Sequence, residues 1–181
     1  MKKNMIFKMV YCSIMAAMAY VCTLFEIPLS FTVTLYGIPL IFVGIMFGPI
    51  YGVLTGLIAG FLEQMKYGIS LQTFLWLLAP ITWGGLSGLL YYGLKKLFND
   101  NKTYKKIIIY TISILLCAIF ANVFNSFALA ILGFSSKPIT DLSMFIVYAS
   151  SRLGSIPIHV VIYVPICFIV CESIKKSKIF G

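Results

Sequence analysis

Arg152 is the residue of this sequence with the clearest capacity for binding chemistry. It lies between two apolar runs, residues 144–148 and 156–163, and it is the only arginine among basic residues that are otherwise lysines and one histidine. An arginine near the middle of a membrane costs at least about 2.5 kcal/mol, so it normally faces a cavity or a partner. Its planar guanidinium can hold a carboxylate through two parallel hydrogen bonds. Arg152 is therefore a candidate ligand for an anionic group, and a structural arginine bound to backbone carbonyls is the alternative.

Other polar and aromatic side chains are expected at a similar depth from the outer side. Arg152 falls about 13 Å below the start of its predicted helix and Asn125 roughly 10 Å below the end of its own, at about 1.5 Å per residue. Asn122 lies one turn deeper, while Gln72 and Trp76 begin another helix from the same side. This convergence predicts a site for a ligand with a carboxylate and a flat ring, since an indole offers a stacking face. For the two asparagines, hydrogen bonds between helices are an equal alternative.

Aromatic residues near the outer side extend this prediction. The complete candidate set for substrate binding is Arg152, Asn125, Asn122, Trp76, Gln72, Phe31, Tyr36 and Tyr148. The long loop 26–35 is too apolar for a plain solvated linker, and one interpretation is a lid that folds back over the mouth of the bundle. An ordinary connector with interfacial aromatic residues is an equal alternative.

The composition indicates that membrane helices position the candidate binding residues. Hydrophobic residues make up 61% of the 181 residues, charged residues make up 10%, and the mean hydropathy is +1.01. Since a span needs about 20 apolar residues, we predict an all-α integral membrane protein with one six-transmembrane-helix domain over residues 1–181. The predicted spans are about 5–25, 36–47, 50–64, 73–94, 106–132 and 143–171. Gly48-Pro49 separates the second and third spans, which are short and are therefore expected to be irregular or tilted.

The lysines orient this bundle. With six spans, both termini and the even-numbered loops share one side, and that side holds Lys2, Lys3, Lys8, Lys95, Lys96, Lys102, Lys105, Lys106, Lys175, Lys176 and Lys178. The other side holds only Lys66 and Lys137. By the positive-inside rule both termini are predicted to be cytoplasmic. The net charge of +9 is thus explained by topology in a lipid bilayer, and no nucleic-acid partner is expected.

Motifs for catalysis or metal binding are missing from the sequence. It has no Ser-His-Asp pattern, no HExxH, no phosphate loop and no CxxC among its five cysteines. His159 has no second histidine beside it, so a hydrogen bond between helices is expected there rather than a metal site. We therefore predict no catalytic residues, no metal and no cofactor, and ATP hydrolysis would have to come from partner subunits.

Small residues line part of the first predicted span. Cys12 and Ala16, and likewise Ser13 and Ala17, are four residues apart, a spacing that lets another helix approach closely. We predict that these four residues dock a partner subunit, with packing inside the bundle as the alternative.

Taken in order along the chain, these features resemble the substrate-binding S component of an energy-coupling factor (ECF) vitamin transporter. The residues that carry the resemblance are the turn at 47–52, the glycine-rich stretch 83–93, Asn125-Ser126, and Arg152 with Pro157. The resemblance covers nearly the whole chain. It implies a vitamin bound near the outer face, a first span docked on a coupling transmembrane subunit, and two partner ATPases. It also implies a multi-pass protein of the bacterial plasma membrane.

Within this superfamily the sequence is most similar to the folate branch, because of Asn125-Ser126 and Arg152 with Pro157. The expected function is capture of folate at the outer face for ATP-driven uptake, with pantothenate as the alternative substrate. Outside the family, a small integral-membrane enzyme or assembly factor would need a polar cluster near the cytoplasmic face. A self-sufficient carrier is disfavoured because the spans show no inverted repeat.

Overall fold

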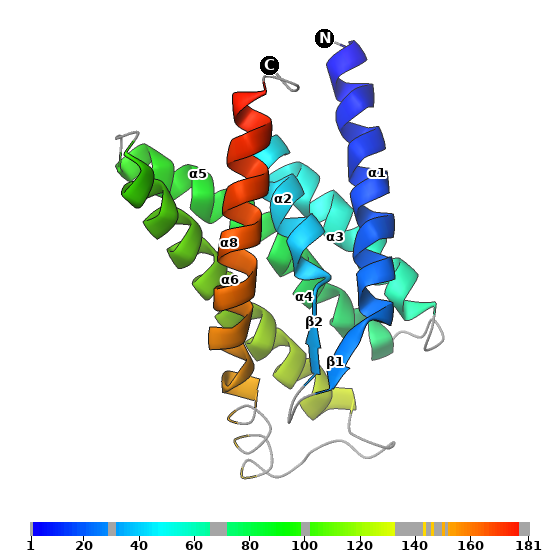
Figure 1. Cartoon of the computed structure of the whole chain (residues 1–181). Coiled ribbons are helices and arrows are strands. Elements are labelled where there is room, and N and C mark those ends of the chain that lie inside the picture. Colours follow the sequence, from blue (N-terminus) through cyan, green and yellow to red (C-terminus); the bar gives the residue numbers. More distant parts are fainter. Residues whose placement is uncertain are drawn as a thin grey trace.

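Long helices form most of the computed structural model (Figure 1), which describes residues 2–28, 32–65, 72–98, 102–132, 143, 146, 150 and 152–177. The long helices are α1 (Lys2–Leu24), α2 (Gly37–Phe47), α3 (Pro49–Gln64), α5 (Ser87–Leu97), α6 (Thr103–Leu132) and α8 (Ser155–Lys176). Among the described residues, four helical stretches are long and apolar enough to cross a membrane, namely Met5–Leu24, Phe74–Leu97, Thr103–Ala128 and Ser155–Lys176. Both chain ends lie at the same end of the bundle, at the top of Figure 1.

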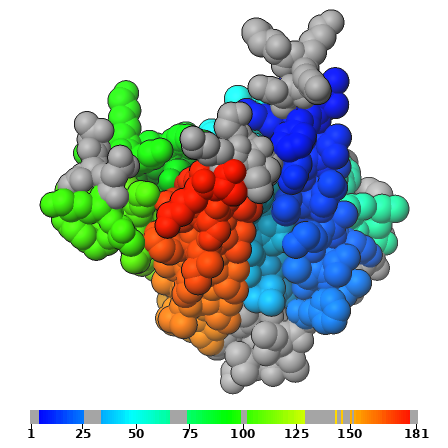
Figure 2. Space-filling view, turned by 45° about the horizontal axis from the view of Figure 1, so that its top comes forward, coloured from blue at the N-terminus to red at the C-terminus, as the bar shows by residue number. Residues whose placement is uncertain are grey.

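The short helix α2 forms the centre of the bundle. Nearly all of its residues are buried, because it contacts α1, α3, α5 and α8 at once. In the space-filling view, α2 is visible between the blue α1 and the orange-red α8 (Figure 2). The helix ends at Phe47 and α3 begins at Pro49, as the Gly48-Pro49 pair predicts. Gly48 has a φ of 105°, a conformation that side chains rarely adopt.

The second and third spans were predicted to be irregular or tilted, but the irregular winding occurs in the segment that follows them, residues 72–97. α2 and α3 are regular α-helices, whereas the next stretch changes its winding three times. It runs through η1 (Gln72–Leu77, a 3₁₀ helix), α4 (Leu78–Ile81), η2 (Thr82–Leu86, a π-helix) and then α5. π-Helical turns are rare and are frequently found at functional sites.

A glycine contact accounts for the close packing at the π-helical turn. A Cβ on Gly84 would lie 2.2 Å from the carbonyl oxygen of Gly52, and one on Gly44 would lie 2.1 Å from that of Gly84. Only glycine fits at such distances, so α2 and α3 meet η2 backbone to backbone. A hydropathy pattern does not report such contacts, and for this reason it does not predict where the irregular segment falls.

The first loop forms a small antiparallel hairpin rather than a plain connector. Strand β1 (Glu26–Pro28) pairs with β2 (Thr32–Thr34), and Glu26 lies opposite Thr34. The hairpin lies at the end of the bundle away from the chain termini (Figure 1), which we call the hairpin end. Among the described residues, the regular elements are thus helices and these two strands, a small correction to the all-α prediction.

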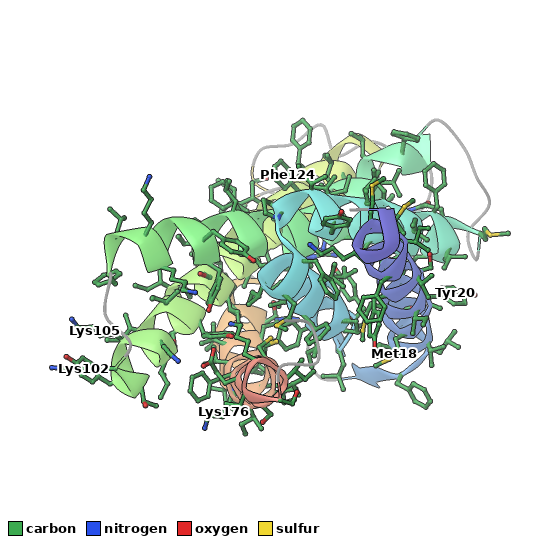
Figure 3. All side chains as sticks on the ribbon, turned by 90° about the horizontal axis from the view of Figure 1, so that it is seen from above. Met18, Tyr20, Lys102, Lys105, Phe124 and Lys176 are labelled. Atoms are coloured by element: carbon green, nitrogen blue, oxygen red, sulfur yellow. The ribbon has the colours of Figure 1, made fainter. Side chains whose placement is uncertain are left out.

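A charged cluster joins three helices at the opposite end. Glu172 of α8 accepts hydrogen bonds from Lys106 Nζ at 2.8 Å and from Lys175 Nζ at 3.1 Å, and its side chain is only 14% exposed. Lys175 also donates to the hydroxyls of Tyr91 on α5 at 2.7 Å and Tyr110 on α6 at 3.2 Å. Seen from this end (Figure 3), Lys102 and Lys105 lie at the edge formed by α6 and Lys176 at the end of α8, away from α1.

Candidate ligand-binding site

Three aromatic rings meet in the interior between η2 and α8. Trp83 lies 5.2 Å from Tyr163 and 5.8 Å from His159 between ring centroids, and His159 lies 5.2 Å from Tyr163. All three side chains are less than 10% exposed. His159 Nδ1 contacts the carbonyl oxygen of Ser155 at 2.7 Å, and because a carbonyl can only accept, Nδ1 carries the proton there. This bond is made within α8, rather than between helices as predicted.

The start of α2 is held against this aromatic cluster. A Cβ on Gly37 would lie 2.6 Å from Cε2 of Tyr163 and 3.2 Å from Cδ2 of Trp83, so the backbone of α2 touches both rings. The hydroxyl of Tyr163 donates a hydrogen bond to the carbonyl oxygen of Thr34. The second hairpin strand, α2 and α8 are therefore joined at one point.

Tyr36 connects the aromatic cluster to charged groups. Its hydroxyl lies within hydrogen-bonding reach of the Trp83 side chain and near both Glu63 and Arg152. A phenol, an indole, a carboxylate and a guanidinium from four segments thus lie around the start of α2.

Arg152 is half-buried. In the part of the chain that the structure describes, no side chain or carbonyl forms an ion pair or a hydrogen bond with its guanidinium. Its backbone carbonyl accepts a hydrogen bond from Ser155 Oγ at 2.7 Å. The arrangement leaves the guanidinium able to bind an anionic group, and it offers no support among these residues for the alternative of an arginine bound to backbone carbonyls.

Asn122 lies beside this segment. Its Nδ2 donates to the carbonyl oxygen of Ala118 at 2.9 Å and makes a long contact of 3.5 Å with Ser155 Oγ. The side chain thus bridges α6 to the start of α8, which is the interhelical role given above as its alternative. Asn122 is also linked indirectly to Arg152, because the Ser155 hydroxyl that it contacts donates a hydrogen bond to the carbonyl oxygen of Arg152.

The remaining predicted site residues are less well connected. Trp76 on η1 and Asn125 on α6 are half-buried, and no interaction among the described residues joins either one to Arg152. Gln72 begins η1, but its side chain is outside the described part. Phe31 and Tyr148 also lie outside the described residues. The sequence reasoning missed Trp83 and Tyr163, although an indole directly before Gly84-Gly85 was a usable signal.

The small residues of α1 divide between two faces. Cys12 is 3% exposed and Ala16 is 0% exposed, and the Cys12 thiol contacts the carbonyl oxygen of Tyr51 on α3 at 3.9 Å. Ser13 and Ala17 are exposed instead. Cys12 and Ala16 therefore pack inside the bundle, and only Ser13 and Ala17 are open to a partner helix.

The fold and site together define a helical membrane protein with a buried aromatic and charged site close to one end. The model of the ECF-type riboflavin transporter S component family matches residues 3–137, and the chain belongs to this family. S components are multi-pass membrane proteins that bind a vitamin and associate with an ECF module of transmembrane and ATPase subunits; they are transporter subunits, not enzymes.

A solved structure shares the fold. ThiT from Listeria monocytogenes superposes with a TM-score of 0.68 over 90% of this chain and 93% of that chain, at 18% sequence identity. At this identity the match shows the fold alone. Comparison with curated protein sequences gives no match.

Proposed function

We propose that this S component captures a vitamin that combines a flat heteroaromatic ring with a carboxylate, and that the vitamin is folate. The observation that carries this proposal is the half-buried Arg152, whose guanidinium has no partner among the described residues and lies near Tyr36. A guanidinium in such a setting binds a carboxylate through paired hydrogen bonds. The adjacent rings of Trp83, Tyr163 and His159 give a ligand ring aromatic surfaces to pack against.

Riboflavin is the second candidate, and the family description favours it. Its ring system is flat and would suit the same aromatic cluster, but riboflavin carries no carboxylate. The family match ends at residue 137, before Arg152, so it does not include the residue on which the folate proposal depends.

A comparison of three vitamins separates these proposals. Folate has a ring and a carboxylate, riboflavin has a ring without a carboxylate, and pantothenate has a carboxylate without an aromatic ring. Each would be titrated into the purified protein and followed by calorimetry or tryptophan fluorescence. We expect tight binding of folate alone. Tight binding of riboflavin with none of folate would replace the proposed ligand, and preference for pantothenate would contradict the role of the aromatic cluster.

We propose six membrane spans with both termini in the cytoplasm. In support, both chain ends lie at one end of the bundle (Figure 1), and Lys106 and Lys175 lie at that end in the charged cluster with Glu172. The hairpin and the start of α2 then face outward, which is where a vitamin arrives. Cysteine labelling from outside intact cells at positions 2 and 66 tests this topology: only a cysteine at position 66 should react.

We further propose that α1 docks on the coupling subunit through Ser13 and Ala17. Both residues are exposed and lie one turn apart, so a partner helix can approach closely. The neighbouring exposed residues Val10, Ile14 and Val21 are apolar and suit either lipid or a partner helix.

A further inference from the structure

The end of α3 carries a buried amide whose oxygen is unsatisfied. Gln64 is the last residue of this helix and is only 6% exposed. Within the described part of the chain, its Oε1 accepts no hydrogen bond. Buried polar side-chain atoms in native proteins nearly always have a partner, so each exception calls for a reason. An apolar residue of similar size would fill the same space without an unpaired oxygen.

The face of α3 that carries Gln64 points at η1 and α4. Gly56, Gly60 and Gln64 are spaced by four residues and so share one face. A Cβ on Gly56 would lie 2.5 Å from the carbonyl oxygen of Pro80, and one on Gly60 would lie 2.7 Å from Cδ2 of Leu77. Gln64 is one turn further along, so it faces η1 at the hairpin end of the bundle.

The same helix end borders the candidate ligand site. Glu63, the preceding residue, lies near the hydroxyl of Tyr36, which also lies near Arg152. Gln64 thus ends the same helix as Glu63, and its face of α3 is directed at η1, which carries the candidate site residue Trp76. A hydrogen-bond donor on a bound ligand would give this buried oxygen the partner that it lacks.

We propose that Gln64 is a specificity-determining residue of the vitamin site, whose side-chain carbonyl accepts a hydrogen bond from an N–H group at the edge of the ligand ring. This inference rests on the proposed binding of a vitamin with a heteroaromatic ring. The pterin of folate and the ring system of riboflavin both carry such N–H groups. A ligand that lacks a donor there would leave the oxygen unpaired in the complex as well, and would be rejected for that reason.

Gln64→Leu tests the proposal, because it removes the acceptor and keeps a similar volume. The matched control is Ser113→Ala on α6. Ser113 is fully buried, its hydroxyl also lacks a partner among the described residues, and it lies one turn from Tyr110 at the lysine-rich end. Thermal unfolding of the ligand-free protein and affinity for folate and for riboflavin would be measured for both variants and for Gln64→Met.

We expect all three variants to be at least as stable as the original protein without ligand. Only the Gln64 variants should bind the preferred vitamin more weakly, by about 2- to 12-fold for one neutral hydrogen bond. Unchanged affinity in folded Gln64 variants would overturn this inference alone. Loss of the fold in both Gln64 variants would overturn it too, because the carboxamide would then have an essential structural partner. If the original protein bound neither vitamin, the proposed function would fail and this inference with it.

Discussion

The ring of Tyr163 lies directly against the backbone of Gly37, with no room for a side chain between them. A Cβ on Gly37 would come within 2.6 Å of the ring. This contact joins the first turn of α2 to the middle of α8, two segments far apart in the sequence. A Cβ on Gly37 would also lie 3.2 Å from Cδ2 of Trp83, so this packing of the two rings requires a residue that has no side chain.

Replacing Gly37 with alanine should therefore distort the site. The added methyl group must displace the rings of Tyr163 and Trp83, and such overpacking typically costs about 1–3 kcal/mol. We expect lower thermal stability and weaker vitamin binding, measured by thermal unfolding in detergent and by titration. Gly93→Ala on α5 is the matched control, since nothing lies within 4 Å of a Cβ there. Equal behaviour of the two variants would show that the contact does not shape the site.

Replacing either of two adjacent alanines on α1 with tryptophan should have a different effect on folding. Ala17→Trp places a ring on the exposed face, so folding and vitamin affinity should be kept while co-purification with the coupling subunit and cellular uptake fall sharply. Ala16→Trp forces a ring into a fully buried position and should prevent stable folding. If Ala17→Trp leaves assembly and uptake intact, the docking face is elsewhere.

The charged cluster should support the fold without contributing to binding. Glu172→Gln removes the charge that pairs with Lys106 and Lys175, and a hydrogen bond to a charged group contributes about 1.5–3 kcal/mol. We expect a lower unfolding temperature and an unchanged affinity for the vitamin. Lys102→Gln, at an exposed position, serves as the control for the loss of one charged side chain. A large loss of affinity in Glu172→Gln would show that the two ends of the bundle are coupled.

The isolated chain should bind its vitamin without nucleotide and be unable to accumulate it. The sequence has no phosphate loop, so energy must come from the ATPases of an ECF module. Reconstitution of this chain alone into liposomes, followed by uptake of labelled vitamin, checks this. Accumulation against a gradient would favour a self-sufficient carrier.

The sequence predicted the helical membrane class and the break at Gly48-Pro49, because hydropathy and proline chemistry act locally. It made Arg152 a candidate, because an arginine in an apolar run normally faces a cavity or a partner. It could not predict the contact of Gly37 with Tyr163 or the π-helical turn at Thr82–Leu86, since both depend on which glycines meet in space.

The split of the small residues on α1 was also not visible in the sequence. Cys12 and Ser13 are adjacent, and a helix turns them to faces about 100° apart. Hydropathy alone does not say which of these faces meets α3 and which remains open. The burial of Cys12 and Ala16 decides this and narrows the predicted docking set to two residues.

The most direct test of the central claim is the affinity of Arg152→Ala for folate. If Arg152 binds the carboxylate, this variant should stay folded and bind folate roughly 10- to 150-fold more weakly, the loss expected for one hydrogen bond to a charged group. Arg152→Lys should recover only part of the affinity, because a lysine lacks the planar fork. Folate binding by Arg152→Ala that equals that of the original protein would contradict the claim.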